Sequence, residues 1–252
     1  MLIRCHYHHK RSNFGDMLTP FILEHYTEKK PVLMDREYEG KILACGSILG
    51  RALRQNDFVW GTGAMRNEEI ILPKGAKIYA VRGPLTRSLI KGKCPEVYGD
   101  PGLLLPEIYN PEVKVIKGAG LLPHFGDYNE IKKMFSGQYI INIRRPIKEV
   151  VREIKSCKLI ITSSLHGLIT AEAYGILAIW TRIIKRRNYK RKAGDGFKFN
   201  DYLLSTGRTE RRPVTWSEAF YGSRNHILPE AIIDTEPLKM AWKELMEDYG
   251  RP

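Results

Sequence analysis

The sequence has no long apolar segment and few cysteines. No apolar run approaches the roughly 18 residues that a membrane-spanning helix needs, which argues against a helical membrane protein. The first residues, MLIRCHYHHK, lack the extended apolar stretch of a secretory signal peptide. The four cysteines are scattered without a CxxC pair, which excludes a disulfide framework or a zinc site of that type. We therefore expect a cytoplasmic protein with reduced thiols.

Motifs of several other function classes are also missing. The chain has no helix-turn-helix, no zinc-finger spacing and no RNP-type aromatic strand, so we expect no nucleic-acid partner. No glycine-rich loop matches GxGxxG. His6, His8 and His9 alternate as metal ligands sometimes do, but no carboxylate follows at ligand spacing. We interpret them as a solvated strand end, and we expect neither a metal nor a cofactor.

The chain does carry a large excess of positive charge. Its 41 Lys and Arg residues exceed its 28 Asp and Glu residues, which gives a net charge of +13 and favours an anionic partner. The densest basic run, RIIKRRNYKRK, covers residues 182–192. Such a run is most often a solvated loop. The alternative is peripheral contact with anionic lipid headgroups at the inner face of a membrane.

Short apolar runs alternate with helical patterns along the chain, which predicts an α/β fold with parallel strands. Several of the runs stop at small-residue loops, as parallel strands do at the carboxyl edge of a sheet. The predicted strands cover residues 1–8, 42–45, 58–60, 77–81, 96–98, 118–122, 139–143, 159–161 and 177–180. We expect one Rossmann-like domain over residues 1–115 and a second over residues 116–230. A C-terminal helix within residues 231–252 is expected to pack back on the first domain.

Residues 159–175, LIITSSLHGLITAEAYG, combine an apolar strand, a polar elbow and a helix that ends at Gly175. Free backbone N–H groups and the helix dipole make such an elbow a natural anion site. His166 stands at this turn, where an imidazole can exchange protons with a bound molecule. The alternative is a serine N-cap beside a histidine that only fills space.

Two further residues occupy similar positions. Arg82 ends a predicted strand just before Pro84 opens a helix, where a guanidinium can grip a phosphate or carboxylate with two hydrogen bonds. The alternative for Arg82 is an interdomain or capping salt bridge. His124 lies in the loop after the strand over residues 118–122 and is the second candidate for proton transfer. Its alternative is a plain loop histidine.

An ordered set of short motifs gives a more specific indication of the protein class. They are NFGD at 13–16, GSIL at 46–49, GTG at 61–63, RGPLT at 82–86, YGDPGLLLP at 98–106, LPHFGD at 122–127, SSLHG at 163–167 and GFKFNDYLLSTG at 196–207. In this order the set resembles the polysaccharide pyruvyltransferase family, especially its ExoV-like branch of exopolysaccharide ketal-pyruvate transferases. The resemblance covers roughly residues 10–207.

The resemblance implies two Rossmann-like domains in a GT-B-like arrangement with a cleft between them. It also implies phosphoenolpyruvate as donor and, as acceptor, a sugar of a cell-surface or exported polysaccharide or of its lipid-linked precursor. The donor ligands that it implies are Arg82 and the elbow residues Ser163, Ser164, Leu165, His166 and Gly167.

One position departs from the family pattern. Some relatives carry an arginine where this chain has Ser164, so another cation would have to replace it. The candidates are Arg144, Arg145 and Lys198. On the acceptor side, the cleft loops contribute Asn13, Asp16, Ser47, Thr62 and Asp100. For Asn13 and Asp16 the alternative is helix capping, and for Asp100 it is turn formation.

The reaction that the resemblance implies requires a proton donor. Ketal formation from phosphoenolpyruvate needs a proton at C3, attack of a sugar hydroxyl at C2, and displacement of phosphate by a second hydroxyl. His166 is the predicted general acid, and His124 the predicted acceptor base or phosphate ligand. Two other functions stay open: a GT-B glycosyltransferase that uses a nucleotide sugar, and a basic protein that binds an anionic polymer without catalysis.

Overall fold

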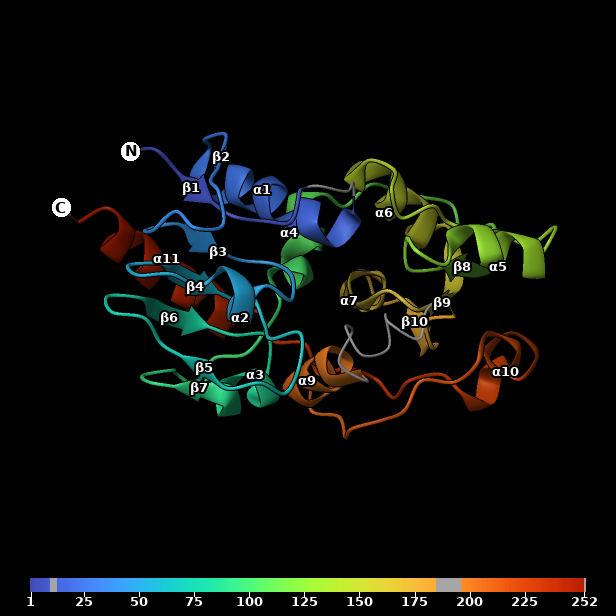
Figure 1. Ribbon diagram of the computed structural model, residues 1–252. Helices are drawn as coiled ribbons and strands as arrows, with labels where there is room; N and C mark the ends of the chain where they lie inside the picture. Colours follow the sequence, from blue (N-terminus) through green and yellow to red (C-terminus); the bar gives the residue numbers. More distant parts are fainter. Residues whose placement is uncertain (10–12, 185–195, 252) are drawn as a thin grey trace.

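The computed structural model describes residues 1–9, 13–184 and 196–251 and confirms an α/β fold with parallel sheets (Figure 1). The first sheet has the strand order β2-β1-β3-β4-β6, and all its strand pairs are parallel. Its strands are β1 (Arg4–Cys5), β2 (Val32–Leu33), β3 (Ile42–Leu43), β4 (Phe58–Trp60) and β6 (Lys77–Ala80). The apolar runs thus identified most of this sheet, although β1 is shorter than predicted.

The second sheet has the order β10-β9-β8 and is also parallel. Its strands are β8 (Lys117–Leu122), β9 (Cys157–Thr162) and β10 (Leu177–Trp180). The helices around it are α5 (Tyr128–Met134), α6 (Ile147–Lys155), α7 (Leu165–Ala173) and α10 (Trp216–Tyr221). The chain from β9 through α7 to β10 is the strand–elbow–helix unit that the sequence predicts.

Two predicted strands are wrong, because each is limited to a single bridge. Tyr98 pairs only with Val81, and Gly99, with a φ of 147°, then turns the chain away. Ile140 pairs only with Leu121, and a turn at residues 142–145 follows, closed by the N–H of Arg145 donating to the carbonyl of Asn142. The small sheet of β5 (Ile70–Ile71) and β7 (Ile90–Lys91) was not predicted.

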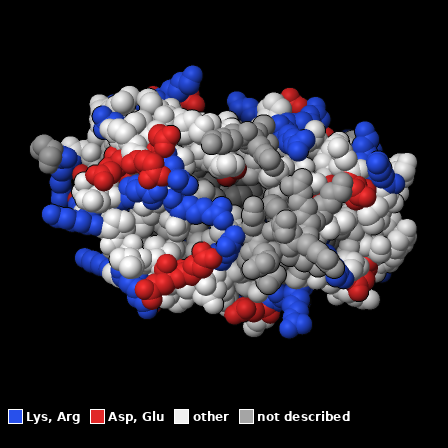
Figure 2. Space-filling model, in the orientation of Figure 1, with Lys and Arg blue, Asp and Glu red and all other residues white. Residues whose placement is uncertain are grey.

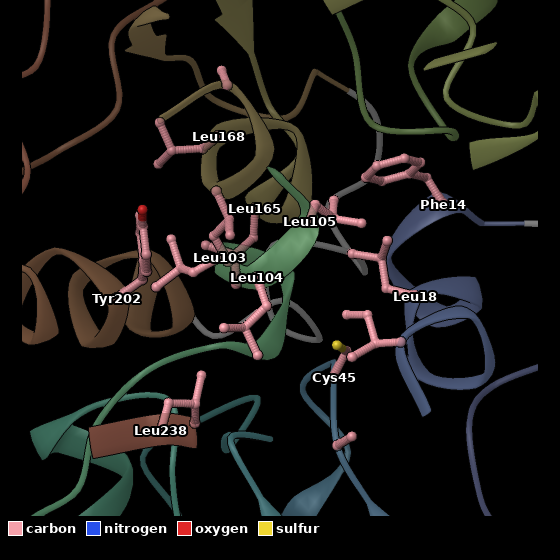
Figure 3. Close-up of a cluster of buried hydrophobic side chains, with 14 of the residues drawn as sticks. Phe14, Leu18, Cys45, Leu103, Leu104, Leu105, Leu165, Leu168, Tyr202 and Leu238 are labelled. Carbon is pink, nitrogen blue, oxygen red and sulfur yellow. The ribbon is translucent and has the colours of Figure 1, made fainter. Parts of the chain in front are cut away.

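One continuous core connects the two larger sheets. It gathers side chains from α1 (Phe14–Thr27), η1 (Pro101–Leu104), α4 (Leu105–Ile108) and α7. Figure 3 shows Phe14 and Leu18 on one side of this cluster and Leu165 and Leu168 on the other. Full burial of one such side chain contributes about 1.5–3 kcal/mol. This packing therefore holds α7 at a defined position beside α1.

The C-terminal helix α11 (Glu236–Tyr249) packs on β4 and β6 of the first sheet. The indole N–H of Trp60 donates to the carbonyl of Leu238 at 2.8 Å. The hydroxyl of Tyr79 donates to the carboxylate of Asp248 at 2.6 Å. The chain thus returns to the first sheet after building the second, whereas the domain limits at residues 115 and 230 stay predictions.

Helix α9 (Phe197–Ser205) contacts α3 (Pro84–Leu89), the helix that begins within the RGPLT motif. Asp201 of α9 accepts from the backbone N–H of Thr86 at 2.8 Å and from its hydroxyl at 2.6 Å. Arg82 forms an ion pair with Asp201 at 2.9 Å, and both side chains are fully buried. A Cβ at Gly83 would collide with the backbone of Asp201, so this contact needs glycine. Of the two roles that the sequence left open for Arg82, a buried salt bridge is present.

We predict that Asp201→Ala lowers the free energy of unfolding by about 3–5 kcal/mol, because it leaves the Arg82 guanidinium buried without its counter-ion. Urea unfolding measures this difference. The matched control is Arg145→Ala, which removes ion pairs to Glu149 and Glu153 from a side chain that is 48% exposed. The control should lose no more than about 1 kcal/mol. Equal losses in the two variants would contradict the prediction.

Candidate active site

A cavity of about 390 Å³ lies between the loops of the first sheet and the start of α7. Eight of the predicted site residues line it: His166, His124, Ser164, Leu165, Lys198, Asn13, Asp16 and Ser47. The remaining lining residues are His6, His8, Arg36, Gly46, Ile48, Arg51, Ala52, Met65 and Phe125. The cavity therefore combines side chains from both halves of the chain with one lysine of α9.

The elbow before α7 is built by hydroxyl groups. The Thr162 hydroxyl donates to the Leu122 carbonyl at 2.7 Å and accepts from the Ser164 N–H at 2.9 Å. The Ser164 hydroxyl caps α7 by accepting from the Gly167 N–H at 3.3 Å. A Cβ at Gly167 would lie 2.7 Å from the Leu122 side chain, so glycine lets α7 start close to β8. Since the first N–H groups of a helix have no partner within it, this end of α7 is suited to an anion.

His166 is held between two other predicted motifs. Its side chain is 11% exposed, and its Nε2 lies 3.3 Å from Oδ2 of Asp100, which is fully buried. On the other side the ring packs against Gly15 of α1. A Cβ at Gly15 would lie 2.5 Å from Cγ of the imidazole and nearer still to Nδ1. The position of this ring thus depends on the NFGD and YGDPG motifs.

Burial changes the protonation of two charged groups in the cavity. It lowers the pKa of Lys198 to about 8, with a further lowering by the charge of Arg82, while Asp16 acts in the opposite direction. Burial also raises the pKa of Asp16. The Asn13 amide donates to Asp16 at 2.8 Å instead of capping α1, and this hydrogen bond opposes the rise. Lys198 is therefore a cation that can lose its proton near neutral pH.

His124 is neutral across the physiological range. Burial, followed by the charges of Lys198 and Arg144, lowers its pKa to about 3. Its Nδ1 accepts from the Gly126 N–H at 3.2 Å, which places the proton of the neutral ring on Nε2. Its backbone N–H donates to the Ser163 hydroxyl at 2.9 Å. The side chain is thus a hydrogen-bond donor rather than a base.

Arg82 does not line this cavity but lies behind its wall. One guanidinium nitrogen donates to the Ser47 hydroxyl at 2.7 Å and another to the Ala64 carbonyl at 2.7 Å. Nε donates to Asp201 at 3.0 Å. Arg82 therefore positions Ser47, and direct contact with a donor stays a prediction.

Three other predicted residues, Thr62, Arg144 and Arg145, do not line the cavity. The Thr62 hydroxyl donates to the Gly46 carbonyl at 2.8 Å. Arg144 is exposed, and its guanidinium donates to the carbonyl of Phe125 at 3.2 Å. Arg145 forms ion pairs with Glu149 and Glu153 on the surface. Of the three cations considered as a replacement at Ser164, Lys198 is the one among the lining residues.

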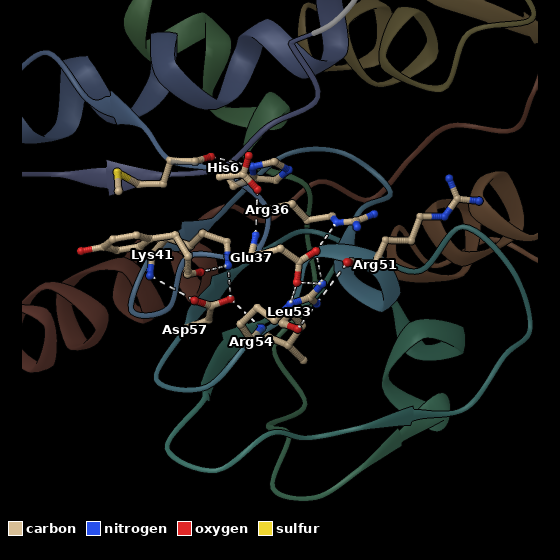
Figure 4. Close-up of polar contacts among 11 residues, drawn as sticks. His6, Arg36, Glu37, Lys41, Arg51, Leu53, Arg54 and Asp57 are labelled. Carbon is tan, nitrogen blue, oxygen red and sulfur yellow. Dashed lines mark hydrogen bonds and ion pairs between the residues drawn. The ribbon is translucent and has the colours of Figure 1, made fainter.

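The sequence did not identify the two arginines at the cavity, Arg36 and Arg51. Arg51 lies in α2 (Leu49–Ala52), directly after the GSIL motif, so extending that motif by one helical turn would have found it. Figure 4 draws no polar contact to the Arg51 guanidinium, whereas Arg36 binds Glu37 at 2.8 Å. Figure 2 shows Lys and Arg side chains around the middle of the face drawn there.

The loop that carries Arg36 is anchored by a buried ion pair. Lys41 and Asp57 are both fully buried, with 2.8 Å between Nζ and Oδ2. Arg54 binds Glu37 at 2.7 Å, next to Arg36 in the sequence (Figure 4). His6 also lines the cavity, and its Nδ1 lies 2.9 Å from the Met34 carbonyl. The interpretation of the histidines at the first strand as a solvated end therefore does not hold for His6 and His8, which line the cavity.

The fold and the cavity together define a class of protein. A helix N-terminus, a buried histidine and a buried lysine meet at the carboxyl edge of parallel strands, as in an α/β enzyme that acts on an anionic substrate. The family model described as polysaccharide pyruvyl transferase matches residues 13–182. The chain belongs to this family, as its motifs predict.

Two curated relatives are similar over most of the chain. An uncharacterized protein of Acanthamoeba polyphaga mimivirus is 30% identical over 221 residues, which is 81% of this chain and 75% of that protein. The succinoglycan biosynthesis protein ExoV of Rhizobium meliloti (strain 1021) is 29% identical over 220 residues, 80% of this chain and 64% of that protein. The chain thus spans less than two thirds of the second relative. No solved structure shows significant similarity to the chain.

The described residues contain neither a candidate membrane span nor a cluster of metal ligands. No helix there has the length and apolar character that a bilayer crossing requires. No group of three or more His, Cys, Asp or Glu side chains there is arranged to hold a metal ion.

We predict that Gly15→Ala displaces the His166 ring, because the added methyl overlaps the imidazole. Overpacking of this kind costs about 1–3 kcal/mol, and the better helix propensity of alanine offsets up to about 1 kcal/mol of it. Changed histidine ring signals in NMR spectra and a lower unfolding temperature would both report the effect. Gly118→Ala is the matched control, since a Cβ there meets nothing within 4 Å. An unchanged His166 signal in Gly15→Ala would contradict the prediction.

Proposed function

We propose that the chain transfers a pyruvyl group from phosphoenolpyruvate to a sugar of a polysaccharide, or of its lipid-linked precursor, and releases phosphate. The two parallel sheets then correspond to Rossmann-like domains in a GT-B-like arrangement, with the reaction in the cavity between them. The observation that carries the proposal is the convergence of His166, Lys198 and the start of α7 on one cavity.

The groups at the α7 end of the cavity suit the negative charge of phosphoenolpyruvate. Phosphoenolpyruvate carries a phosphate and a carboxylate, and both are stabilised by backbone N–H groups and by cations. Lys198 supplies a buried cation there, and the Ser164 hydroxyl keeps its own hydrogen for donation because it only accepts from Gly167. In this proposal Lys198 replaces the arginine that some family members carry before Leu-His.

His166 acts as the general acid and then as a base. Its proton goes to C3 of the donor, which becomes a methyl group while positive charge develops at C2. The first sugar hydroxyl attacks C2 and returns a proton to His166. The second hydroxyl attacks C2 as the C2–O bond to phosphate breaks, and its proton leaves with the phosphate. A positioned acid of this kind contributes about 10²–10⁴-fold to the rate.

His124 acts as a neutral donor to the phosphate. The sequence left two roles open for it, acceptor base or phosphate ligand. A pKa of about 3 makes it a poor base for a sugar hydroxyl, and the Gly126 N–H already occupies its Nδ1. The N–H at Nε2 then suits a hydrogen bond to an anion, so we assign the phosphate role.

The acceptor lies against the wall formed by the first sheet. Asn13, Asp16 and Ser47 offer amide, carboxylate and hydroxyl groups to sugar hydroxyls there. Arg36 and Arg51 add positive charge at the same wall, which supports an acceptor that carries a phosphate linkage. Contact of residues 182–192 with a membrane stays a prediction, because residues 185–195 lie outside the described part of the chain, and so does the cytoplasmic location.

We predict that His166→Ala lowers the rate of phosphate release from phosphoenolpyruvate, with a competent acceptor, by about 10²–10⁴-fold. A phosphate-release assay measures the rate. His25→Ala is the control, since this exposed histidine of α1 is not among the cavity residues and should leave the rate unchanged. A normal rate in His166→Ala would refute the assignment of the acid. Tight binding of UDP or GDP, with no binding of phosphoenolpyruvate, would favour a nucleotide-sugar glycosyltransferase instead.

We predict that phosphoenolpyruvate binds more weakly as the pH rises above about 8. Below this pKa the Lys198 amine is charged, and above it the charge is lost unless the ligand restores it. One linked proton raises Kd by at most about tenfold per pH unit. Isothermal titration calorimetry from pH 7 to 10 measures the trend. Lys198→Arg stays charged over this range and should remove it, whereas a wild-type Kd that does not depend on pH would rule out the role of Lys198.

A further inference from the structure

Asp100 and His166 place two buried polar atoms opposite each other. Oδ2 of Asp100 and Nε2 of His166 are 3.3 Å apart, and neither atom makes a hydrogen bond of regular geometry with any described residue. Buried polar atoms are almost always hydrogen-bonded. Two unpartnered buried atoms at this distance therefore indicate that the carboxylate and the imidazole pair with each other.

The carboxylate of Asp100 is held rigidly. Its other oxygen, Oδ1, accepts from the Gly102 N–H at 2.9 Å and thereby caps η1. The Cys45 thiol lies beside the same carboxylate, and burial together with the negative charge of Asp100 raises the pKa of that thiol. Oδ1 of Asp100 is thus used in capping η1, whereas Oδ2 lies next to Nε2 of His166.

The imidazole is fixed on its opposite edge. Nδ1 lies on the side of Gly15, where the absence of a side chain makes room for the imidazole itself. Asp16, on the same turn of α1, lines the cavity and interacts electrostatically with His166 and Lys198. The charged groups around the ring are therefore Asp100 on the buried side, and Asp16 with Lys198 on the cavity side.

We propose that Asp100 is a positioning residue that accepts the Nε2–H of His166 and so reserves Nδ1 for proton exchange with the substrate. The second half of this inference rests on the proposed function. In the reaction, Nδ1–H passes to C3 of the donor and leaves a neutral ring that keeps Nε2–H on Asp100. Nδ1 then takes the proton of the attacking hydroxyl. Asp100 gains no proton at any step, and its role is to fix the tautomer and the ring orientation.

The test is Asp100→Asn. The asparagine oxygen can still accept from Gly102, so the cap of η1 is kept, while its NH₂ group faces Nε2 and favours the opposite tautomer. We expect kcat for phosphate release to fall about 10²–10⁴-fold, with KM for phosphoenolpyruvate changed less than about threefold. Histidine ¹⁵N spectra, recorded at a pH at which the His166 ring is neutral and assigned with His166→Gln, should show Nε2–H in the wild type and Nδ1–H in the variant.

Asp16→Asn is the matched control. It removes the same charge next to His166 but not the contact at Nε2, so the ring should keep the Nε2–H tautomer. The inference is overturned if the neutral His166 ring of the wild type carries its proton on Nδ1, a measurement that needs no variant to fold. It is also overturned if Asp100→Asn leaves the tautomer and kcat unchanged. A tautomer switch in a protein that releases no phosphate from phosphoenolpyruvate supports the pairing and refutes the proposed function.

Discussion

The buried ion pair between Arg82 and Asp201 is the contact on which the geometry of the cavity depends. It joins α9 to the start of α3, and Lys198 stands three residues before Asp201, on the neighbouring helical turn. The same guanidinium donates to Ser47, which lines the cavity. Taking two charges out of water costs several kcal/mol per ion, and only good geometry with further hydrogen bonds offsets it. Here the hydroxyl and N–H of Thr86 supply those bonds to Asp201, so one pair fixes both a lysine and a serine of the cavity.

Burial gives the cavity its chemical character. The same loss of water contact lowers the pKa of Lys198 and of His124 and raises that of Asp16. Each of the three groups is thereby shifted toward its neutral form. The lining residues Arg36, Arg51 and Lys198 outnumber the acidic Asp16, so the net charge of the cavity is positive. An incoming dianion is stabilised more strongly there than at a solvated surface, because fewer water dipoles screen its charge. Binding of the anion in turn favours the charged form of Lys198.

Much of the fold could be predicted from the sequence, because local patterns determine it. Strands β4 and β10 have the predicted bounds, and the elbow before α7 follows directly from its apolar run, its hydroxyl residues and its helical spacing. The predicted strands over residues 96–98 and 139–143 fail because apolar character alone does not supply a neighbour to pair with. Helix α1 begins at Phe14, so Gly15 and Asp16 of the NFGD motif lie in its first turn.

The site was harder to predict, because its contacts join distant parts of the chain. The position of Arg82 at a strand end fits a donor ligand and a salt bridge equally well, and its partner Asp201 lies 119 residues further on. Arg36 lies at the cavity on a loop that the pair of Lys41 and Asp57 helps to anchor, a contact that no local pattern reveals. Asking which cation could replace a missing arginine gave three candidates, Arg144, Arg145 and Lys198, and of these Lys198 lines the cavity.

The contacts between motifs explain why the whole set identifies the family although each motif is short. NFGD meets SSLHG where Gly15 packs on His166, and YGDPG meets the same histidine through Asp100. RGPLT meets the α9 motif through Arg82 and Asp201. Residues that look like substrate ligands in the sequence therefore act in large part on one another. Each holds a side chain of the cavity, either His166 or Lys198, in a fixed position, and a site preorganised in this way does not have to order these groups when a ligand arrives.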